Sequence, residues 1–269
     1  MKLDGVLGIL GFGNMGRALA AGLVQKGTFS PSRICVYDVD PAKCMAAQDL
    51  NLRVAGSSAE LVGAIDYLML AVKPQSMEGA LSELRTHWTA DVLVLSIAAG
   101  ISTEYIRHRL GDAVRVVRVM PNTPAMVLAG AAGVALGAGC GAQEAEIARA
   151  IFESVGVCEI VPEKDMDIVT ALSGSGPAYF FYMVECLVKA AVAHGLPEKQ
   201  AASLAAQTLL GAGRLLTESG EAASTLRERV TSKGGTTEAA LKRFREADFE
   251  GVVVAGVSAA AARSKELGK

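Results

Sequence analysis

Short apolar runs alternate with polar or helical stretches through the first 161 residues of the chain. The runs have the length of β-strands and lie at residues 6–10, 34–37, 67–72, 92–97, 114–120 and 158–161. Alternation of this kind predicts parallel βαβ units, and therefore an α/β domain with a mostly parallel sheet.

After residue 161 the strand-like runs stop and the apolar spacing becomes helical. The pattern predicts one helix from Pro177 to Gly195 and a second from Pro197 to about Ser219, because proline favours the first turn of a helix and glycine its end. We therefore expect an all-α domain over residues 162–269.

The first of these predicted helices is apolar nearly all round. Glu185 and Lys189 are its only charged residues before the final His194. A helix of this kind must be buried on all sides. A small helical domain offers little room for that, so burial between two subunits is the simpler solution.

The first apolar run is followed at once by GFGNMG, in which Gly11, Gly13 and Gly16 satisfy the GxGxxG spacing. From Met15 the apolar positions recur at helical spacing, and Gly27 is well placed to end that helix. Strand, glycine turn and helix are the context in which this fingerprint binds a dinucleotide, with the pyrophosphate facing the free N–H groups of the helix start. A tight strand-to-helix turn without a ligand is the alternative.

Three loops follow later apolar runs: AVKPQS at 71–76, SIAAG at 96–100 and MPNTPA at 120–125. In an open parallel sheet, ligands bind outside the carboxyl ends of the strands, so we expect these loops to line the cofactor groove. Lys73 is the only charged residue among them. It either contacts a ribose or phosphate of the cofactor or is a solvated loop lysine.

Asp38 ends the second apolar run, 22 residues beyond Gly16. An acidic side chain there accepts hydrogen bonds from the adenosine ribose hydroxyls of a dinucleotide and repels a 2′-phosphate. The alternative is a turn-forming aspartate, because the sequence YDVDP is good turn chemistry by itself.

The sequence TSKGGTT, residues 231–237, joins two stretches of helical spacing. Its glycines expose backbone N–H groups just where a new helix is expected to begin, at about Thr236. Orphan N–H groups and the positive end of a helix bind a carboxylate well. The hydroxyls of Thr236 and Thr237 are then free to serve a neighbouring atom. An ordinary Gly-Gly turn capped by threonines is the alternative.

Composition and charge narrow the classes of function. No window of about 18 residues is free of charged or strongly polar groups, so we expect a cytoplasmic protein without a transmembrane segment. The formal charge of -2 and the lack of a long basic run do not indicate binding to nucleic acid or to an anionic membrane. The 5 scattered cysteines and 3 distant histidines form no metal motif, so the cysteines are interpreted as reduced core residues and no metal is expected. A small molecule is the expected partner.

Six motifs follow one another between Gly11 and Leu241: GFGNMG, AVKPQ, SIAAG, RVMPNTPA, ALSGSGPAY and TSKGGTTEAAL. In this order they resemble pyrroline-5-carboxylate reductase, the family that catalyses the last step of proline synthesis. The resemblance covers almost the whole chain, and MPNTP, LSGSGPAY and GGTT are together highly specific.

The resemblance implies a Rossmann domain over residues 1–161 and an all-helical substrate-binding and dimerisation domain over residues 162–269. It further implies a homodimer with intertwined helical domains. A larger assembly built from such dimers is also compatible with the resemblance. The implied reaction is reduction of the cyclic imine 1-pyrroline-5-carboxylate to L-proline by NADPH or NADH.

The resemblance also assigns site residues. The substrate carboxylate would be held by Ser232, Gly234, Gly235 and Thr236, and Thr237 matches the hydroxyl near the imine nitrogen. Glu163, just before the helical domain, is a weaker match to a substrate-side carboxylate. The cofactor contacts would fall on Gly11, Phe12, Gly13, Asn14, Met15, Ala71, Val72, Lys73, Pro74, Ala98, Ala99 and Gly100.

Two positions depart from the family pattern. Lys233 stands where the family usually has proline, which leaves the backbone freer and adds a charge that assists an anionic substrate or faces solvent. Asp38 stands where the family commonly has small polar or basic residues. The sequence therefore leaves both NADPH and NADH as candidate cofactors.

The expected chemistry agrees with these residues. Hydride transfer to a C=N bond needs the nicotinamide face held close to the imine carbon and a proton kept on the nitrogen. If the imine binds protonated, a hydroxyl that fixes its N–H and a nest for the carboxylate suffice.

Two other functions compete with this interpretation. A β-hydroxyacid dehydrogenase has the same domain order but places a catalytic lysine on the first helix after a Gly-x-Gly turn, where this chain has Phe180. A non-catalytic NAD(P)-binding protein would leave the GGTT motif unexplained.

Overall fold

The computed structural model describes residues 3–88 and 91–268. The chain forms two compact units. The first unit runs up to Ser175 and also includes the chain from Ala260 onward, and the second spans Gly176–Ala259. The chain therefore passes from the first unit into the second and returns.

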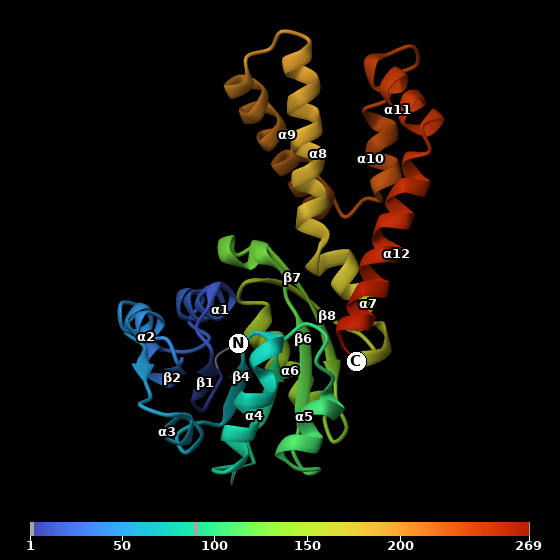
Figure 1. The fold of residues 1–269 in the computed structure, drawn as a ribbon. Helices are drawn as coiled ribbons and strands as arrows, with labels where there is room; N and C mark the ends of the chain where they lie inside the picture. The colour runs from blue at the N-terminus through green and yellow to red at the C-terminus, as the bar shows by residue number, and fades with distance from the viewer. Residues whose placement is uncertain (1–2, 89–90, 269) are drawn as a thin grey trace. The chain divides into compact units, whose positions relative to one another are not determined.

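The first unit is built on a sheet with the strand order β3-β2-β1-β4-β5-β6-β7-β8 in the described residues (Figure 1). Neighbouring strands are parallel except for the β6–β7 pair. The predicted α/β domain with a mostly parallel sheet is confirmed. The strands are β1 (Leu7–Leu10), β2 (Ile34–Tyr37), β3 (Arg53–Val54), β4 (Tyr67–Leu70), β5 (Leu93–Ser96), β6 (Val116–Met120), β7 (Gly130–Leu136) and β8 (Gly156–Ile160).

Helices cover both faces of this sheet. Side chains of one strand alternate between two cores: Met69 packs in one core, while Leu68 and Leu70 pack in the other. Because both faces are buried, the strands read as continuous apolar runs, which is why most of them are visible in the sequence. The first core takes α1 (Asn14–Gln25), α2 (Pro41–Gln48) and α6 (Ala142–Phe152), and the second takes α3 (Ser58–Val62), α4 (Met77–Arg85) and α5 (Thr103–Leu110).

Two strands, β3 and β7, have no counterpart among the apolar runs that the sequence analysis identified. β7 reads GAAGVAL, in which small residues replace the branched side chains that mark a strand. A Cβ atom on Gly133 would lie 2.5 Å from Val169 Cγ1 at the end of α7 (Met166–Val169), so close packing excludes a larger residue there.

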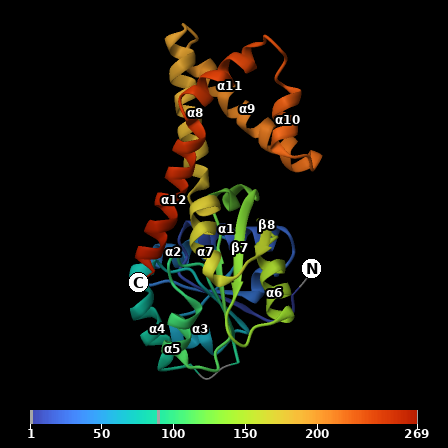
Figure 2. The ribbon, with the colours of Figure 1, turned by 90° about the vertical axis from the view of Figure 1, so that its right-hand side faces the viewer.

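The second unit is entirely helical in the described residues (Figure 2). The predicted helix from Pro177 is α8, and the one after Pro197 is α9, which packs along α8. Gly195 and Gly220 adopt φ angles of 88° and 66°, the left-handed conformation that ends both helices. The helices are α8 (Gly176–Ala193), α9 (Glu198–Ser219), α10 (Ala223–Arg229), α11 (Thr236–Glu246) and the first part of α12 (Phe249–Leu267).

α8 is apolar and largely exposed in the single chain. Phe180, Phe181 and Tyr182 are 58%, 59% and 65% exposed. By length and composition alone, one helical stretch of the described residues, Glu163–Ala193, is apolar enough to cross a membrane. A single such helix is a weak indication, because a helix buried in a protein interior has the same composition.

The five cysteines are all free. Cys35 and Cys158 are buried, and burial raises the pKa of the Cys158 thiol to about 11, which leaves little reactive thiolate near neutral pH. Cys186 lies exposed on α8, so the interpretation of the cysteines as core residues is wrong at that position in the single chain.

The end of α12 is anchored to the first unit. Ser264 is 6% exposed, and its hydroxyl donates a hydrogen bond of 2.7 Å to Asp167 Oδ1. Gly268 lies against the loop after β5, where a Cβ atom on it would be 2.8 Å from the Gly100 oxygen. This contact joins the returning chain to a loop that the sequence analysis placed in the cofactor groove.

We expect Ser264→Ala to lower the free energy of unfolding by about 1 kcal/mol, because it removes a buried hydrogen bond to a charged acceptor. The matched control is Ser258→Ala on the exposed part of α12, which brings the same gain in helix propensity without that bond. Urea unfolding followed by circular dichroism at equal protein concentrations measures both variants. Equal stability of the two would contradict the anchoring role.

Candidate active site

The packing of β1 against α1 and the loop after β4 needs glycine at two of the three fingerprint positions. Gly11 has a φ of 93°, and a Cβ atom there would lie 2.8 Å from the backbone of Ala71. A Cβ atom on Gly16 would lie 2.7 Å from the Gly11 oxygen, so this glycine lets helix and strand pack closely. Both of these glycines serve the fold itself.

Gly13 differs from its neighbours. Its φ of -72° suits any residue, and a Cβ atom there would meet no protein atom within 4 Å. The space left free is the groove in front of the helix start, where backbone N–H groups bind a phosphate anion. A Cβ atom would fill that cradle, so the residues of this turn fit the diphosphate of a dinucleotide.

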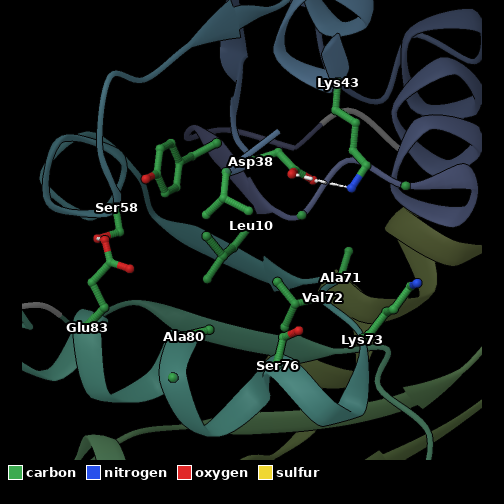
Figure 3. A pocket seen from close by; sticks show the side chains of 15 residues that line it. Leu10, Asp38, Lys43, Ser58, Ala71, Val72, Lys73, Ser76, Ala80 and Glu83 are labelled. Atoms are coloured by element: carbon green, nitrogen blue, oxygen red, sulfur yellow. Dashed lines mark hydrogen bonds and ion pairs between the residues drawn. The ribbon is translucent and has the colours of Figure 1, made fainter. Parts of the chain in front are cut away.

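Two cavities meet in front of this turn. One of about 540 Å³ lies beside the ends of β1, β2 and β4 (Figure 3). The other, of about 400 Å³, extends to the loops after β5 and β6. They form one groove, because both are lined by Gly13, Ala71, Val72 and Lys73. The groove crosses the place where β1 has β2 on one side and β4 on the other, the switch point at which doubly wound sheets bind their ligands.

Most of the expected cofactor residues come together in this groove. Phe12 and Gly100 are not among the lining residues: the Phe12 side chain is 2% exposed and packs in the core, and Gly100 packs under the end of α12. The expected residues that do line the groove are Gly11, Gly13, Asn14, Met15, Asp38, Ala71, Val72, Lys73, Pro74, Ala98 and Ala99.

Sequence reasoning missed several residues at the larger cavity. Lys43 on α2, Ser58 on α3 and Glu83 on α4 all line it (Figure 3). The Ser58 hydroxyl donates a hydrogen bond to Glu83 Oε1. In the sequence, each of these residues stands at a position typical of the solvent-facing side of a helix. No local sequence pattern therefore identifies it as a cavity residue.

Asp38 forms the local turn and also lines the larger cavity, while its contact with an adenosine ribose remains a prediction. The residue is 9% exposed, and its carboxylate accepts hydrogen bonds from the N–H of Phe12 at 2.7 Å and of Asp40 at 2.9 Å. The second bond is the local turn that YDVDP indicates. The first bond ties the glycine turn to the end of β2, and the same residue lines the larger cavity.

A buried asparagine organises the smaller cavity. Asn122 is 8% exposed, donates to the Ser173 oxygen at 3.0 Å and accepts the N–H of Ala131 at 2.9 Å. Ser173 belongs to a π-helical turn, Thr170–Gly174, and such turns are frequent at functional sites. Asn122 thereby fixes the turn whose last residue, Gly174, lines the cavity.

Glu163 lies within the first unit and contacts two of its elements, α5 and β6. Its Oε1 accepts the N–H of Thr103 at 2.8 Å, and its Oε2 accepts the Thr103 hydroxyl at 2.6 Å. The guanidinium of Arg118, 8% exposed, lies 3.7 Å from Oε1. These contacts join the start of the short helix Glu163–Asp165 to α5 and β6, and the substrate role of Glu163 remains a prediction.

The TSKGGTT loop belongs to the second unit and leads into α11. Gly234 has a φ of 74°, and its N–H donates to Glu238 Oε2 at 2.7 Å. The N–H of Gly235 donates to the Ser232 oxygen at 3.0 Å, and a Cβ atom on Gly235 would lie 2.5 Å from the Ser232 hydroxyl. Glycine is therefore required at both positions to form the turn.

The start of α11 is open to a ligand. Gly235 is the N-cap residue and offers no side chain to cap the helix, while Glu238 in the first turn accepts the N–H of Gly234. Thr236 is exposed and Thr237 is half-buried. The N–H groups of this first turn and the positive end of the helix are suited to a carboxylate, as the sequence analysis expects.

Family models match most of the chain. Residues 163–267 match the model described as pyrroline-5-carboxylate reductase dimerisation. Residues 6–100 match the model described as NADP oxidoreductase coenzyme F420-dependent. Among the described residues, no group of three or more histidine, cysteine, aspartate or glutamate side chains is arranged to hold a metal ion.

Individual proteins are similar over the full length. A curated pyrroline-5-carboxylate reductase from Methanosarcina acetivorans is 40% identical over 98% of this chain and 98% of its own. The solved pyrroline-5-carboxylate reductase of Coxiella burnetii is 36% identical, with a TM-score of 0.93 and 98% of both chains covered. The Plasmodium falciparum pyrroline carboxylate reductase, solved with NADP bound, is 30% identical, with a TM-score of 0.87 and 100% of both chains covered.

A dehydrogenase of the competing type is similar only in fold. The 3-hydroxyisobutyrate dehydrogenase of Mycobacterium tuberculosis is 15% identical, with a TM-score of 0.52, and the match covers 87% of this chain and 72% of that one. Identity at this level indicates a common architecture and carries no statement about the reaction.

We expect Gly13→Ala to weaken dinucleotide binding by about tenfold or more, because the new methyl group fills the space in which a diphosphate would lie. Stability should fall by no more than about 1 kcal/mol, since the position tolerates a Cβ atom. Gly16→Ala should instead lower stability by about 1–3 kcal/mol through overpacking against Gly11. Nicotinamide fluorescence titration and urea unfolding separate the two effects. Unchanged affinity in folded Gly13→Ala would show that no diphosphate lies at this turn.

Proposed function

The chain belongs to the pyrroline-5-carboxylate reductase family, and from this premise we propose that it reduces 1-pyrroline-5-carboxylate to L-proline with NADPH or NADH. Proline biosynthesis in the cytoplasm is the proposed setting. The observation that carries the proposal is that one chain holds both a dinucleotide groove, opened by Gly13, in its first unit and a helix start at α11 without an N-cap side chain, suited to a carboxylate, in its second.

The groove holds the cofactor by its backbone. The N–H groups after Gly13 would hold the diphosphate, and the small side chains of Ala71, Ala98 and Ala99 leave room along the groove for flat rings. When bound, the nicotinamide cofactor supplies a hydride. The task of the chain is to hold the loops around the ring in place, and Asn122 does this for the π-helical turn through its hydrogen bond to the Ser173 oxygen.

The TSKGGTT loop orients the substrate. The N–H groups at the start of α11 bind the carboxylate and so set the direction in which the imine ring extends. The Thr237 hydroxyl accepts the hydrogen bond of the protonated imine nitrogen. As hydride adds to the imine carbon, the C=N electron pair moves onto the nitrogen, which keeps its proton, so the step needs no further acid.

A homodimer is the proposed assembly. The family model matched by residues 163–267 is a dimerisation model, and that stretch includes α8 with its exposed aromatic side chains. Contiguous apolar surface of this kind is typical of subunit interfaces. The same burial accounts for the apolar composition of α8 without a membrane, and an assembly of several dimers is compatible with it.

The competing functions predict different assay results. A spectrophotometric assay follows the loss of reduced-nicotinamide absorbance on addition of 1-pyrroline-5-carboxylate, with 3-hydroxyisobutyrate and oxidised cofactor as the comparison. We expect turnover with the imine and none with the alcohol, because Phe180 offers no amine to handle an alcohol proton. Cofactor binding without turnover of either substrate would favour a non-catalytic protein.

We expect Thr237→Val to lower kcat by roughly 10- to 10³-fold, because it keeps the branched shape but removes the hydroxyl that holds the imine N–H. Dinucleotide affinity should barely change. Thr236→Val is the matched control: it should act mainly on KM, since the backbone N–H groups that bind the carboxylate survive the substitution.

Circular dichroism checks that both threonine variants are folded, because either side chain lies in the first turn of α11. Steady-state kinetics then separates kcat from KM. A folded Thr237→Val enzyme with unchanged kcat would show that this hydroxyl is structural and that the proton on nitrogen is held by another group.

We expect light scattering to find a dimer or a larger assembly at every concentration that supports activity, because a single chain leaves the apolar α8 side chains in water. Activity measured across a dilution series provides the comparison. A stable and active monomer would contradict the proposed assembly.

A further inference from the structure

The adenosine end of the groove contains a carboxylate that is fixed in place. Asp38 follows β2 directly and lines the larger cavity (Figure 3). Its Oδ2 accepts the N–H of Phe12 and its Oδ1 accepts the N–H of Asp40. Because both donors belong to the backbone, the carboxylate cannot turn away from the cavity without breaking the glycine turn and the β2–α2 turn.

The counter-charge of Asp38 comes from a longer and more exposed side chain. Lys43 Nζ lies 3.4 Å from both Asp38 oxygens, and the Lys43 side chain is 42% exposed against 6% for Asp38. Lys43 reaches the carboxylate from the side (Figure 3). The pair therefore consists of a buried, immobile negative charge and a partly solvated positive one, which water screens more strongly.

The rest of this cavity does not supply a phosphate site. Glu83 brings a second carboxylate to the lining, and its Oε1 accepts the Ser58 hydroxyl. Lys73 is the other cation of the lining, and it lies on the loop where the two cavities meet. Lys43 thus remains the one cation of the lining that contacts the end of β2, and it is already paired.

The two forms of the cofactor differ at this point. The adenosine ribose of NADH presents two hydroxyl groups, which donate hydrogen bonds to an acidic residue at the end of the second strand. NADPH carries a phosphate with a charge of about -1.5 to -2 there, which a fixed carboxylate repels.

We propose that this protein binds NADH in preference to NADPH, with Asp38 as the specificity-determining residue and Lys43 as the counter-ion of its carboxylate. The inference rests on the proposed function and names the form of the cofactor that the groove takes. It places this chain apart from the solved Plasmodium relative, which was obtained with NADP bound.

The test is the dissociation constant of each nucleotide, measured by nicotinamide fluorescence with the full-length protein in the absence of substrate. We expect wild-type protein to bind NADH about tenfold or more tightly than NADPH, since the repulsion between like charges a few ångströms apart near a surface has an effect of at least this size. Asp38→Ser should shift the ratio of the two constants by about tenfold or more toward NADPH.

A neighbouring carboxylate provides the matched control. Asp40 belongs to the same turn, its side chain is 47% exposed, and its Oδ1 caps α2 by accepting the N–H of Ala42. Asp40→Asn removes the same formal charge and keeps a capping oxygen. It should change the NADH to NADPH ratio by less than about threefold, because an exposed charge is screened by water.

Asp38→Ser also removes the acceptor of two backbone bonds, so thermal unfolding is recorded for each variant. Asp38→Asn, which keeps one oxygen, serves as a second variant and should shift the ratio in the same direction. Kinetic selectivity measured as kcat/KM for the two cofactors should follow the binding ratio.

The outcomes separate this inference from the proposed function. Wild-type protein that binds NADPH as tightly as NADH would overturn the inference and indicate that Lys43 leaves Asp38 to hold the phosphate. An equal shift in Asp40→Asn and Asp38→Ser would overturn the role of the fixed carboxylate. Failure of both nucleotides to bind would overturn the proposed function itself.

Discussion

The first unit depends on a contact of backbone against backbone. Gly11 approaches the main chain of Ala71 so closely that no side chain fits between β1 and the loop after β4, and Gly16 does the same between α1 and the end of β1. This packing brings the start of α1 level with the carboxyl ends of the central strands. The groove, the free N–H groups and the position of Asp38 all follow from it, because Asp38 bonds to the residue next to Gly11.

The sequence predicts the parts of this arrangement that depend on local pattern. Burial on both faces makes most strands continuous apolar runs, and glycine and proline mark the ends of α1, α8 and α9. β7 escapes such an analysis because its small residues reflect the close approach of α7 at Gly133, a tertiary constraint that leaves no periodic signal. The end of α12 escapes it for the same reason, since its contact with Gly100 joins segments far apart in the chain.

The candidate site divides in the same way. Motifs identify the glycine turn, the loops after the strands and the TSKGGTT turn, because each needs particular backbone angles or a particular terminus. They do not identify Lys43, Ser58 or Glu83, whose place in the cavity lining depends only on which helices meet there. The motifs also do not show that Asn122 connects β7 to the π-helical turn. Turn formation alone would explain an asparagine in the PNTP loop equally well.

The return of the chain at Ala260 makes the second unit an insertion within the first. During synthesis the strands of the sheet leave the ribosome early, yet the segment that anchors Ser264 to Asp167 follows only after the whole helical unit. The first unit therefore completes its packing after the second has been translated, whereas domains joined end to end mature one after the other. A nascent chain of this design exposes the apolar side chains of α8 before the packing of its own first unit is complete.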